Sequence, residues 1–408
     1  MGHVVPSAEP STRSPSAGAG PCPPAWRLEH DLTGHLAELA RFRRRRQLER
    51  SPLYGRLQDE IERVLHGFEW RLQPPVPPPT GPPTLRAAAW NLERGKQLDA
   101  ILATFAEQPS LRDADLLFLT ELDIGMARSG NLNIAERIAD ELGMAYVFAN
   151  FHLVLAPGDH GEQRQHEANT LALHGSAIMS RYPIRRFDAV SLPECVDKFH
   201  VLEKRLGSKR SLIAEVLTPH GSITAIVVHL DPFAGSRHRG FQMARTMAAA
   251  RRFGGDRVLL GGDLNTNTYH LGSARGLAAN FARKMVVLGF DRTVEQYLTP
   301  QKIFERPVFN SLAAHGMHVD GFNDLTKGTF HYDLRDPDVV RKTSDYIPPV
   351  LYRWLDRRLE PWQGRVPMRI DWFAGRGLSP RSPWVIELPQ HHGVRASDHH
   401  PIGVTVDL

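Results

Sequence analysis

The strongest constraint on the fold is a series of short apolar segments that starts at Leu85 and continues to the C-terminus. Their length and their content of β-branched and aromatic residues predict strands. These segments are 85–92, 115–122, 144–155, 176–180, 210–218, 222–230, 257–264, 369–375 and 400–408. Helical patterns occupy 95–107, 133–143, 239–254 and parts of 273–360. Because strands and helices do not alternate strictly, the pattern predicts an α/β four-layer sandwich, in which two packed mixed β-sheets are flanked by helices.

The chain before this series predicts three further segments. Residues 1–28 are rich in Ser, Pro, Gly and Ala and predict a disordered low-complexity tail. Residues 29–72 predict a helical extension, with one helix over 35–50 and a second that starts after the N-cap Ser51. Residues 73–84 predict a stiff Pro-rich linker, because proline fixes φ and removes a hydrogen-bond donor. Residues 85–408 would then form the catalytic domain.

The extension contains a run of basic residues, Arg41–Arg50, with six arginines and one glutamate. Its charge of +5 equals the net charge of the whole 408-residue chain, so the basic character is local. The run is either a solvated helix face or a docking surface for an anionic partner.

Several protein classes are excluded by composition. No apolar run approaches the roughly 18 residues that a membrane helix needs. The first 20 residues lack the apolar core of a signal peptide. The two cysteines, Cys22 and Cys195, do not suggest a disulfide framework, and we therefore expect a cytoplasmic protein.

Polar residues follow the predicted strands at the points where the strands end. In "LLGGDLNT", Asp263 and Asn265 are two residues apart, so they share one face of an extended segment. Alone, this stretch has the composition of an ordinary turn. Further polar residues stand at or near strand ends: Asn91, Glu121, His229, Asp371, Asp398 and His399. Because such groups need partners near a core, and Mg²⁺ prefers oxygen ligands, a shared cation site is one explanation.

The motifs that contain these residues are "WNLERG", "LTELD", "HGSAIMSRYPI", "VVHLD", "GGDLNT", "RIDW" and "ASDHHP". In this order, over some 320 residues, they resemble the endonuclease/exonuclease/phosphatase superfamily, in particular its deoxyribonuclease, sphingomyelinase and phosphatase branches. The resemblance implies a two-sheet α/β sandwich and metal-dependent hydrolysis of a phosphoester. Mg²⁺ is the implied cofactor, with Mn²⁺ as a substitute. Glu121 resembles the main metal carboxylate, and Asn91 and Asp398 would lie beside it.

The resemblance also implies the catalytic residues. Asp263 resembles the residue that orients and deprotonates the attacking water, and Asn265 would position that water or a phosphate oxygen. His399 resembles the histidine that contacts the scissile phosphate, with Asp371 holding its tautomer. His229 would be a second histidine that faces the phosphate.

Substrate choice is expected in the loops after these residues. Arg128 and Asn131 follow Glu121, and Arg237 follows His229; a guanidinium matches a phosphate bidentately, although loop solubility explains these residues equally well. The long segment 273–360 is a candidate lid or specificity insert. The leading function is a nuclease-like phosphodiester hydrolase. The alternatives are a phosphodiesterase or phosphatase of a lipid headgroup, sugar phosphate or nucleotide, and, more remotely, a non-catalytic binding protein. No protein partner follows from the sequence.

Overall fold

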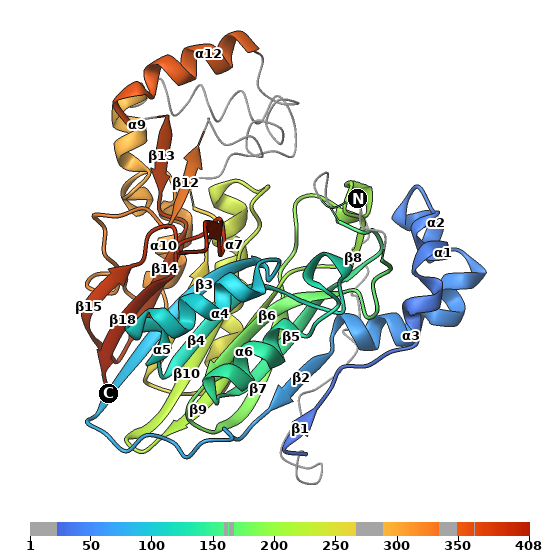
Figure 1. Ribbon diagram of the computed structural model, residues 1–408, viewed down its shortest axis with the longest axis horizontal. Helices are drawn as coiled ribbons and strands as arrows, with labels where there is room; N and C mark the ends of the chain where they lie inside the picture. Colours follow the sequence, from blue (N-terminus) through green and yellow to red (C-terminus); the bar gives the residue numbers. More distant parts are fainter. Residues whose placement is uncertain (1–22, 159–161, 163–166, 267–288, 334–348, 363) are drawn as a thin grey trace, which may run out of the picture.

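Two β-sheets pack face to face and carry helices on their outer faces (Figure 1). The computed structural model describes residues 23–158, 162, 167–266, 289–333, 349–362 and 364–408. The predicted α/β four-layer sandwich is confirmed. The predicted tail lies largely outside the described residues.

The larger sheet has nine strands in the order β1-β2-β5-β6-β4-β3-β18-β15, with β8 paired to β5. Strands β3 and β4 are parallel and the other neighbours are antiparallel. The strands are β1 (Ala25–Trp26), β2 (Phe68–Arg71), β3 (Thr84–Arg94), β4 (Leu116–Ile124), β5 (Ala145–Val154), β6 (Leu173–Ser180), β8 (Arg205–Gly207), β15 (Ser379–Val385) and β18 (Ile402–Asp407).

The smaller sheet has five strands in the order β14-β11-β10-β9-β7, with β10 and β11 parallel. Its strands are β7 (Ile184–Ser191), β9 (Arg210–Thr218), β10 (Gly221–His229), β11 (Val258–Asp263) and β14 (Asp371–Arg376). Two small ribbons pair β12 (Phe330–Asp333) with β13 (Arg365–Met368), and β16 (Gln390–His391) with β17 (Val394–Arg395).

Helices cover both sheets. Those packed on the larger sheet are α1 (Leu36–Ala40), α2 (Arg45–Glu49), α3 (Pro52–Leu65), α4 (Leu98–Glu107), α5 (Pro109–Arg112) and α6 (Ile134–Leu142). The smaller sheet is covered by α7 (Ser236–Ala250) and α10 (Arg306–Ala313). Short 3-10 helices span Leu32–His35, Ala127–Ser129, Lys198–His200, Arg251–Phe253, Pro300–Lys302 and Glu360–Trp362.

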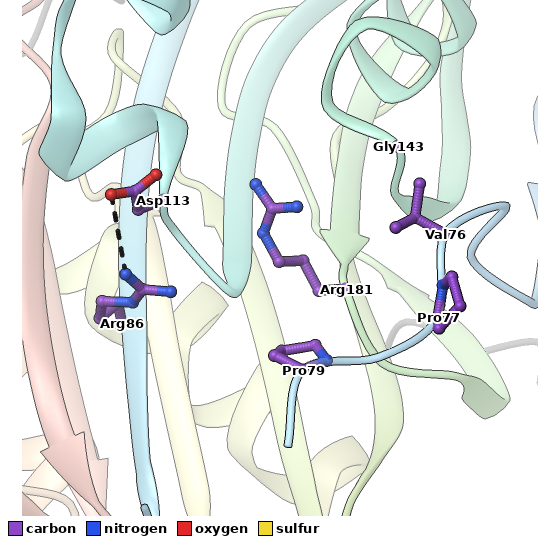
Figure 2. Close-up of a pocket in the computed structure, with 7 residues that line it drawn as sticks. All are labelled: Val76, Pro77, Pro79, Arg86, Asp113, Gly143 and Arg181. Atoms are coloured by element: carbon purple, nitrogen blue, oxygen red, sulfur yellow. Dashed lines mark ion pairs between the residues drawn. The ribbon is translucent and has the colours of Figure 1, made fainter. Parts of the chain in front are cut away.

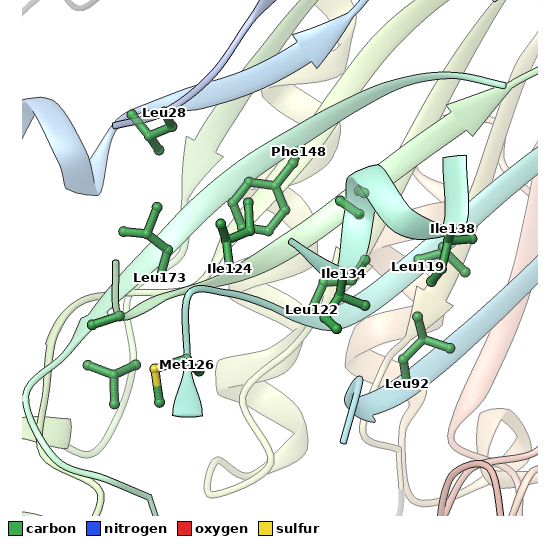
Figure 3. Packing of buried hydrophobic residues seen from close by; sticks show 14 of the residues in the cluster. Leu28, Leu92, Leu119, Leu122, Ile124, Met126, Ile134, Ile138, Phe148 and Leu173 are labelled. Carbon is green, nitrogen blue, oxygen red and sulfur yellow. The ribbon is translucent and has the colours of Figure 1, made fainter. Parts of the chain in front are cut away.

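The alternation of side chains along each strand divides the core into layers. In β3, Ala87 and Ala89 face the other sheet, whereas Trp90 and Leu92 pack under the helices. Figure 3 shows the helix-side layer, where Ile134 and Ile138 of α6 lie over strand residues such as Leu119. A third layer joins α7 and α10 to the outer face of the smaller sheet.

The N-terminal segment is part of this packing. The second helix begins as expected, with Ser51 Oγ accepting a hydrogen bond from Tyr54 N and Pro52 in the first turn. The first expected helix is broken into a 3-10 turn, α1 and α2. Strand β2 pairs with β5, and Leu28 joins the helix-side core. The segment expected as a separate helical extension therefore supplies strand β2 of the larger sheet, whereas the edge strand β1 lies at the end of the predicted tail. The division into domains stays a prediction.

A small unit projects from one end of the sandwich (Figure 1). It contains α9 (Phe290–Gln296), α12 (Pro349–Arg358) and the β12–β13 ribbon, and it has its own apolar cluster. These elements fall within or next to the long segment expected as a lid or specificity insert; residues 267–288 and 334–348 lie outside the described residues.

Candidate active site

The space between the two sheets is apolar over most of its length and becomes polar at one end. On β11, Leu259 and Gly261 face the other sheet and Asp263 follows them on the same face. The change from apolar to polar side chains also occurs on the two neighbouring strands. On β10, the apolar Val227 is followed two residues later by His229. On β14, Phe373 stands across from Gly261, and Asp371 lies two residues before it. The strand registers pair His229 with Asp263 and Asp263 with Asp371. The sheet therefore brings three predicted site residues side by side.

Two glycines before Asp263 are required by close packing. A Cβ on Gly261 would lie 2.7 Å from the Phe373 ring and 3.0 Å from the Phe118 ring of the opposite sheet, and one on Gly262 would lie 2.2 Å from Val228 O. Gly262 also has a φ of 137°, which side chains other than glycine rarely adopt. The "GG" of "LLGGDLNT" thus lets β11 approach both the opposite sheet and β10.

Asp263 is buried and held by amides. Its Oδ1 accepts a hydrogen bond from Asn265 N at 2.8 Å, and its Oδ2 accepts bonds from Asn265 Nδ2 at 3.0 Å and Asn91 Nδ2 at 3.2 Å. Burial and the neighbouring Asp371 carboxylate raise the pKa of Asp263 to about 7. The side chain is fixed in position, and its affinity for a proton lies near neutral pH.

Asp371 and His399 form a buried pair. His399 Nδ1 lies 2.9 Å from Asp371 Oδ2, and the Asp371 Oδ1 atom has no hydrogen-bond partner among the described residues. Burial alone would lower the pKa of His399, but the Asp371 carboxylate raises it well above the ordinary value. The main chain is fixed by Trp90 Nε1, which donates to His399 O at 3.0 Å. The imidazole therefore keeps its Nε2 side for another partner.

His229 stands next to the buried carboxylate. Its Nε2 is 3.4 Å from Asp263 Oδ2 and 3.8 Å from Glu121 Oε1, and its Nδ1 has no partner in the described part of the chain. Burial and Lys209 lower the pKa of His229 well below its ordinary value. We therefore treat this imidazole as neutral.

Glu121 occupies a special backbone position. The pairing of β4 with its neighbours shifts next to this residue, and Glu121 has a φ of 55°. Such bulges re-aim a side chain, and strained backbone of this kind gathers at functional sites. The side chain keeps 25% exposure, and no hydrogen-bond donor of the described residues reaches its carboxylate.

The predicted metal ligands have a donor set that fits a divalent cation. Within the described chain, the Asp398 carboxylate has one long contact, from Ser397 Oγ at 3.5 Å. Ser397 Oγ donates to Asn91 O at 2.7 Å, which places Asp398 beside Asn91. Two partly buried carboxylates with so few hydrogen bonds need a cation or water, and oxygen donors suit Mg²⁺.

A second cation-binding geometry involves the catalytic candidates. Ligand atoms of Asp263, Asp371 and His399 all lie within 4.8 Å of one another, the spacing of a possible metal site. Because His399 Nδ1 is already bound to Asp371, a metal on that nitrogen would break the pair. We therefore favour the Glu121 side for the metal.

The three residues expected to reach the substrate have different surroundings. The Arg128 side chain is buried and pairs with Asp123 at 2.6 Å and Glu203 at 2.5 Å, contacts that disfavour a direct role with substrate, and its predicted role stays a prediction. Asn131 holds the neighbouring loop through Ala168 O at 3.1 Å. Arg237 is exposed near the start of α7 and stays a candidate.

Sequence reasoning missed a buried charged cluster beside Glu121. His174 Nδ1 lies 2.8 Å from Asp123 Oδ1, which in turn binds Arg128. Lys209 is buried; burial lowers the pKa of its ammonium to about 8, opposed by the charges of Glu121, Glu194 and Asp263. His174 and Asp123 stand in quoted motifs and could have been found there, whereas "GSKRS" gives no sign that Lys209 is buried.

A surface pocket of about 270 Å³ lies at the other end of the larger sheet (Figure 2). Arg86 and Arg181 line it together with Val76 and Pro79 of the Pro-rich segment. Arg86 precedes Asn91 by five residues on β3, a separation of about 17 Å along a strand. The pocket is therefore separate from the candidate site.

The profile of the Endonuclease/Exonuclease/phosphatase family matches residues 88–399. The chain belongs to this family and is a phosphoester hydrolase. A search of curated protein sequences found no match. No helix in the described part of the chain is long and apolar enough to cross a membrane.

Solved structures with a similar chain trace come from several organisms. An endonuclease/exonuclease/phosphatase from Beutenbergia cavernae has 15% identity and a TM-score of 0.45, with 80% of this chain and 72% of that chain covered. A humanized D. rerio TDP2 has 13% identity and a TM-score of 0.42, with coverage of 80% and 100%. Sphingomyelinase C from Streptomyces griseocarneus has 13% identity and a TM-score of 0.42, with coverage of 79% and 99%.

Proposed function

We propose that the protein is a Mg²⁺-dependent, nuclease-like hydrolase of phosphodiester bonds. The observation that carries this proposal is the convergence of Asp263, Asp371 and His399, whose polar atoms lie within 4.8 Å of one another at the polar end of the sandwich. The residues that the sequence assigns to catalysis thus meet at one point. A cytoplasmic location stays a prediction.

Asp263 is the proposed proton acceptor for the attacking water. The two hydrogen bonds from Asn265 and the one from Asn91 orient its carboxylate, so one fixed group faces the incoming water. The water oxygen bonds to phosphorus as the bond to the leaving oxygen breaks, and the water proton passes to Asp263.

His399 is the proposed donor to the phosphate. With Nδ1 on Asp371, the protonated ring presents Nε2–H to a non-bridging oxygen, where negative charge builds up in the transition state. His229, as a neutral imidazole next to Asp263, would contact the same phosphate from the other side.

Asn91, Glu121 and Asp398 are the proposed holders of the metal. Bound there, Mg²⁺ would neutralise phosphate charge and polarise the phosphorus–oxygen bonds. Mn²⁺, with similar oxygen preference, is expected to substitute.

A panel of substrates tests the proposal. Purified protein with Mg²⁺, Mn²⁺ or EDTA is given single- and double-stranded DNA, RNA, a phospholipid headgroup analogue and bis-p-nitrophenyl phosphate. We expect metal-dependent cleavage of the polynucleotides and of the small diester. Turnover of the headgroup analogue without polynucleotide cleavage would instead favour the lipid alternative, and a lack of turnover in every arm would contradict the proposed function.

A further inference from the structure

The surface over Arg41–Arg50 carries a concentrated, unpaired positive charge. Arg45 pairs with Asp197 at 2.9 Å. The other five guanidiniums are exposed and have no hydrogen-bond or ion-pair partner anywhere in the described structure: Arg41, Arg43, Arg44, Arg46 and Arg50. We call these five residues the arginine surface. Since the run accounts for a charge of +5 in a chain whose net charge is +5, the charges of all other residues sum to zero.

The backbone under the arginine surface is fixed. Leu36 and Leu39 of α1 and Leu48 of α2 are buried in the helix-side core of the larger sheet. The turn between the two helices is tied down by Lys204, whose Nζ donates to Ala40 O and Phe42 O at 2.7 Å each. A solvated charge run needs no such anchoring, whereas a binding surface gains affinity when its charges are held in place before binding.

One segment of the chain links the arginine surface to the charged cluster beside Glu121. Figure 1 shows α1 and α2 at the flank of the molecule, near β8. The segment 197–204 connects the two regions: its Asp197 binds Arg45, and Lys204 binds the α1–α2 turn. Glu203, which directly precedes Lys204 in the sequence, pairs with Arg94 and Arg128 in the charged cluster beside Glu121. A long substrate in the site could therefore continue onto the arginines.

The chemistry of the surface fits a chain of phosphodiesters. Guanidiniums bind phosphate oxygens bidentately, and unpaired ones release bound counterions when a polyanion replaces them. An anionic membrane is the other polyanion, but interfacial binding needs apolar side chains that enter the lipid. Among the large apolar side chains exposed in the described structure, none lies between residues 36 and 56, and a single one, Leu202, lies on the segment 197–204.

We propose that the arginine surface binds the sugar–phosphate backbone of a nucleic acid, several nucleotides away from the bond that is cleaved. This inference rests on the proposed function and narrows its substrate to polynucleotides.

The test is equilibrium binding of a fluorescein-labelled 20-nucleotide single-stranded DNA to the full-length protein in EDTA, followed by anisotropy from 50 to 200 mM salt. The test variant carries four substitutions: Arg41→Gln, Arg43→Gln, Arg44→Gln and Arg46→Gln. The matched control removes four exposed arginines elsewhere, outside the segment 273–360: Arg112→Gln, Arg137→Gln, Arg251→Gln and Arg252→Gln. Both variants lose the same charge, so they differ in position alone.

We expect the wild type and the control variant to show the same steep salt dependence. In the test variant, four lost phosphate contacts should reduce the slope of log K against log salt by about 2.8. Between 50 and 200 mM salt, the loss of affinity of the test variant should therefore be about 50-fold smaller than that of the wild type. Equal slopes for the test and control variants would overturn the inference. Vesicles of anionic phospholipid are the second probe. If the test variant loses vesicle binding but binds DNA like the wild type, the inference is overturned in favour of a membrane partner.

The two proposals fail in different ways. Because binding in EDTA needs no turnover, the DNA slopes judge the arginine surface even if no substrate is hydrolysed. Hydrolysis of bis-p-nitrophenyl phosphate, which is too small to reach the arginines, should be unchanged in the test variant; a large loss there would show that the substitutions disturb the catalytic site and would contradict the surface as described.

Discussion

The Asp371–His399 pair gives the sharpest mutational prediction. Asp371→Asn keeps the size of the side chain but replaces a carboxylate that lies 2.9 Å from His399 Nδ1 with a neutral amide. A hydrogen bond to a charged group contributes about 1.5–3 kcal/mol. If the imidazolium contacts the phosphate in the transition state, losing this amount should lower kcat/KM about 10- to 150-fold, at 1.36 kcal/mol per tenfold.

The assay is hydrolysis of bis-p-nitrophenyl phosphate at saturating Mg²⁺, with circular dichroism to establish that the variant is folded. The control is Asp115→Asn, at a buried aspartate that binds Arg86 at the far end of β3. This control breaks an ion pair whose aspartate is buried like Asp371 and should leave kcat/KM within about twofold, a range smaller than 0.5 kcal/mol. A folded Asp371→Asn protein with the control's activity would refute the proposed role of the pair.

Three further predictions concern the metal, the N-terminal segment and pH. Glu121→Gln should raise the Mg²⁺ concentration for half-maximal activity by about tenfold or more; an unchanged metal titration would remove Glu121 from the ligand set. Deletion of residues 1–72 removes two strands and several fully buried leucines, each of which stabilises the fold by about 1.5–3 kcal/mol. We therefore expect insoluble or unfolded protein, and an unchanged melting temperature would contradict this. Burial lowers the pKa of His30, whose Nδ1 accepts a hydrogen bond from Leu32 N. Folding therefore favours the neutral ring, and the free energy of unfolding should decrease below pH 6.5 by up to about 1.4 kcal/mol per pH unit. Urea unfolding at pH 7.5 and 5.5 should show a smaller decrease for His30→Gln than for the wild type. Equal decreases would contradict the assignment to His30.

The sequence was a good guide to the strands of the sandwich. Segments such as 210–218 and 222–230 contain either alternating apolar and polar residues or a continuous apolar run, over the length of a typical strand. Strands β9 and β10 occupy almost the same residues as these two segments. The short strand β2, Phe68–Arg71, was missed because Phe68 continues the apolar stripe of the preceding helix, so that the helical spacing outweighed the break at Gly67. Its pairing with β5 depends on residues about 80 positions away, which a local pattern does not contain.

The site shows the same division between local and long-range information. Asp263 and Asn265 were recognised because both their spacing and their motif are local, and the structure places them in hydrogen-bond contact. The burial of Arg128 was not predicted, since its loop position suggested exposure while its partners Asp123 and Glu203 come from β4 and from a segment 75 residues further on. Buried ion pairs assembled from distant segments are not visible in a single sequence.

The central claim is that Asp263 serves a metal-dependent phosphoester hydrolase. The most direct measurement compares hydrolysis of bis-p-nitrophenyl phosphate by the wild type and by Asp263→Asn, each with Mg²⁺ and with EDTA. We predict turnover by the wild type with Mg²⁺, its loss in EDTA, and a decrease of at least about 100-fold in the folded variant, as expected when a general base is removed. Equal turnover by the folded variant, or undiminished turnover of the wild type in EDTA, would contradict the account.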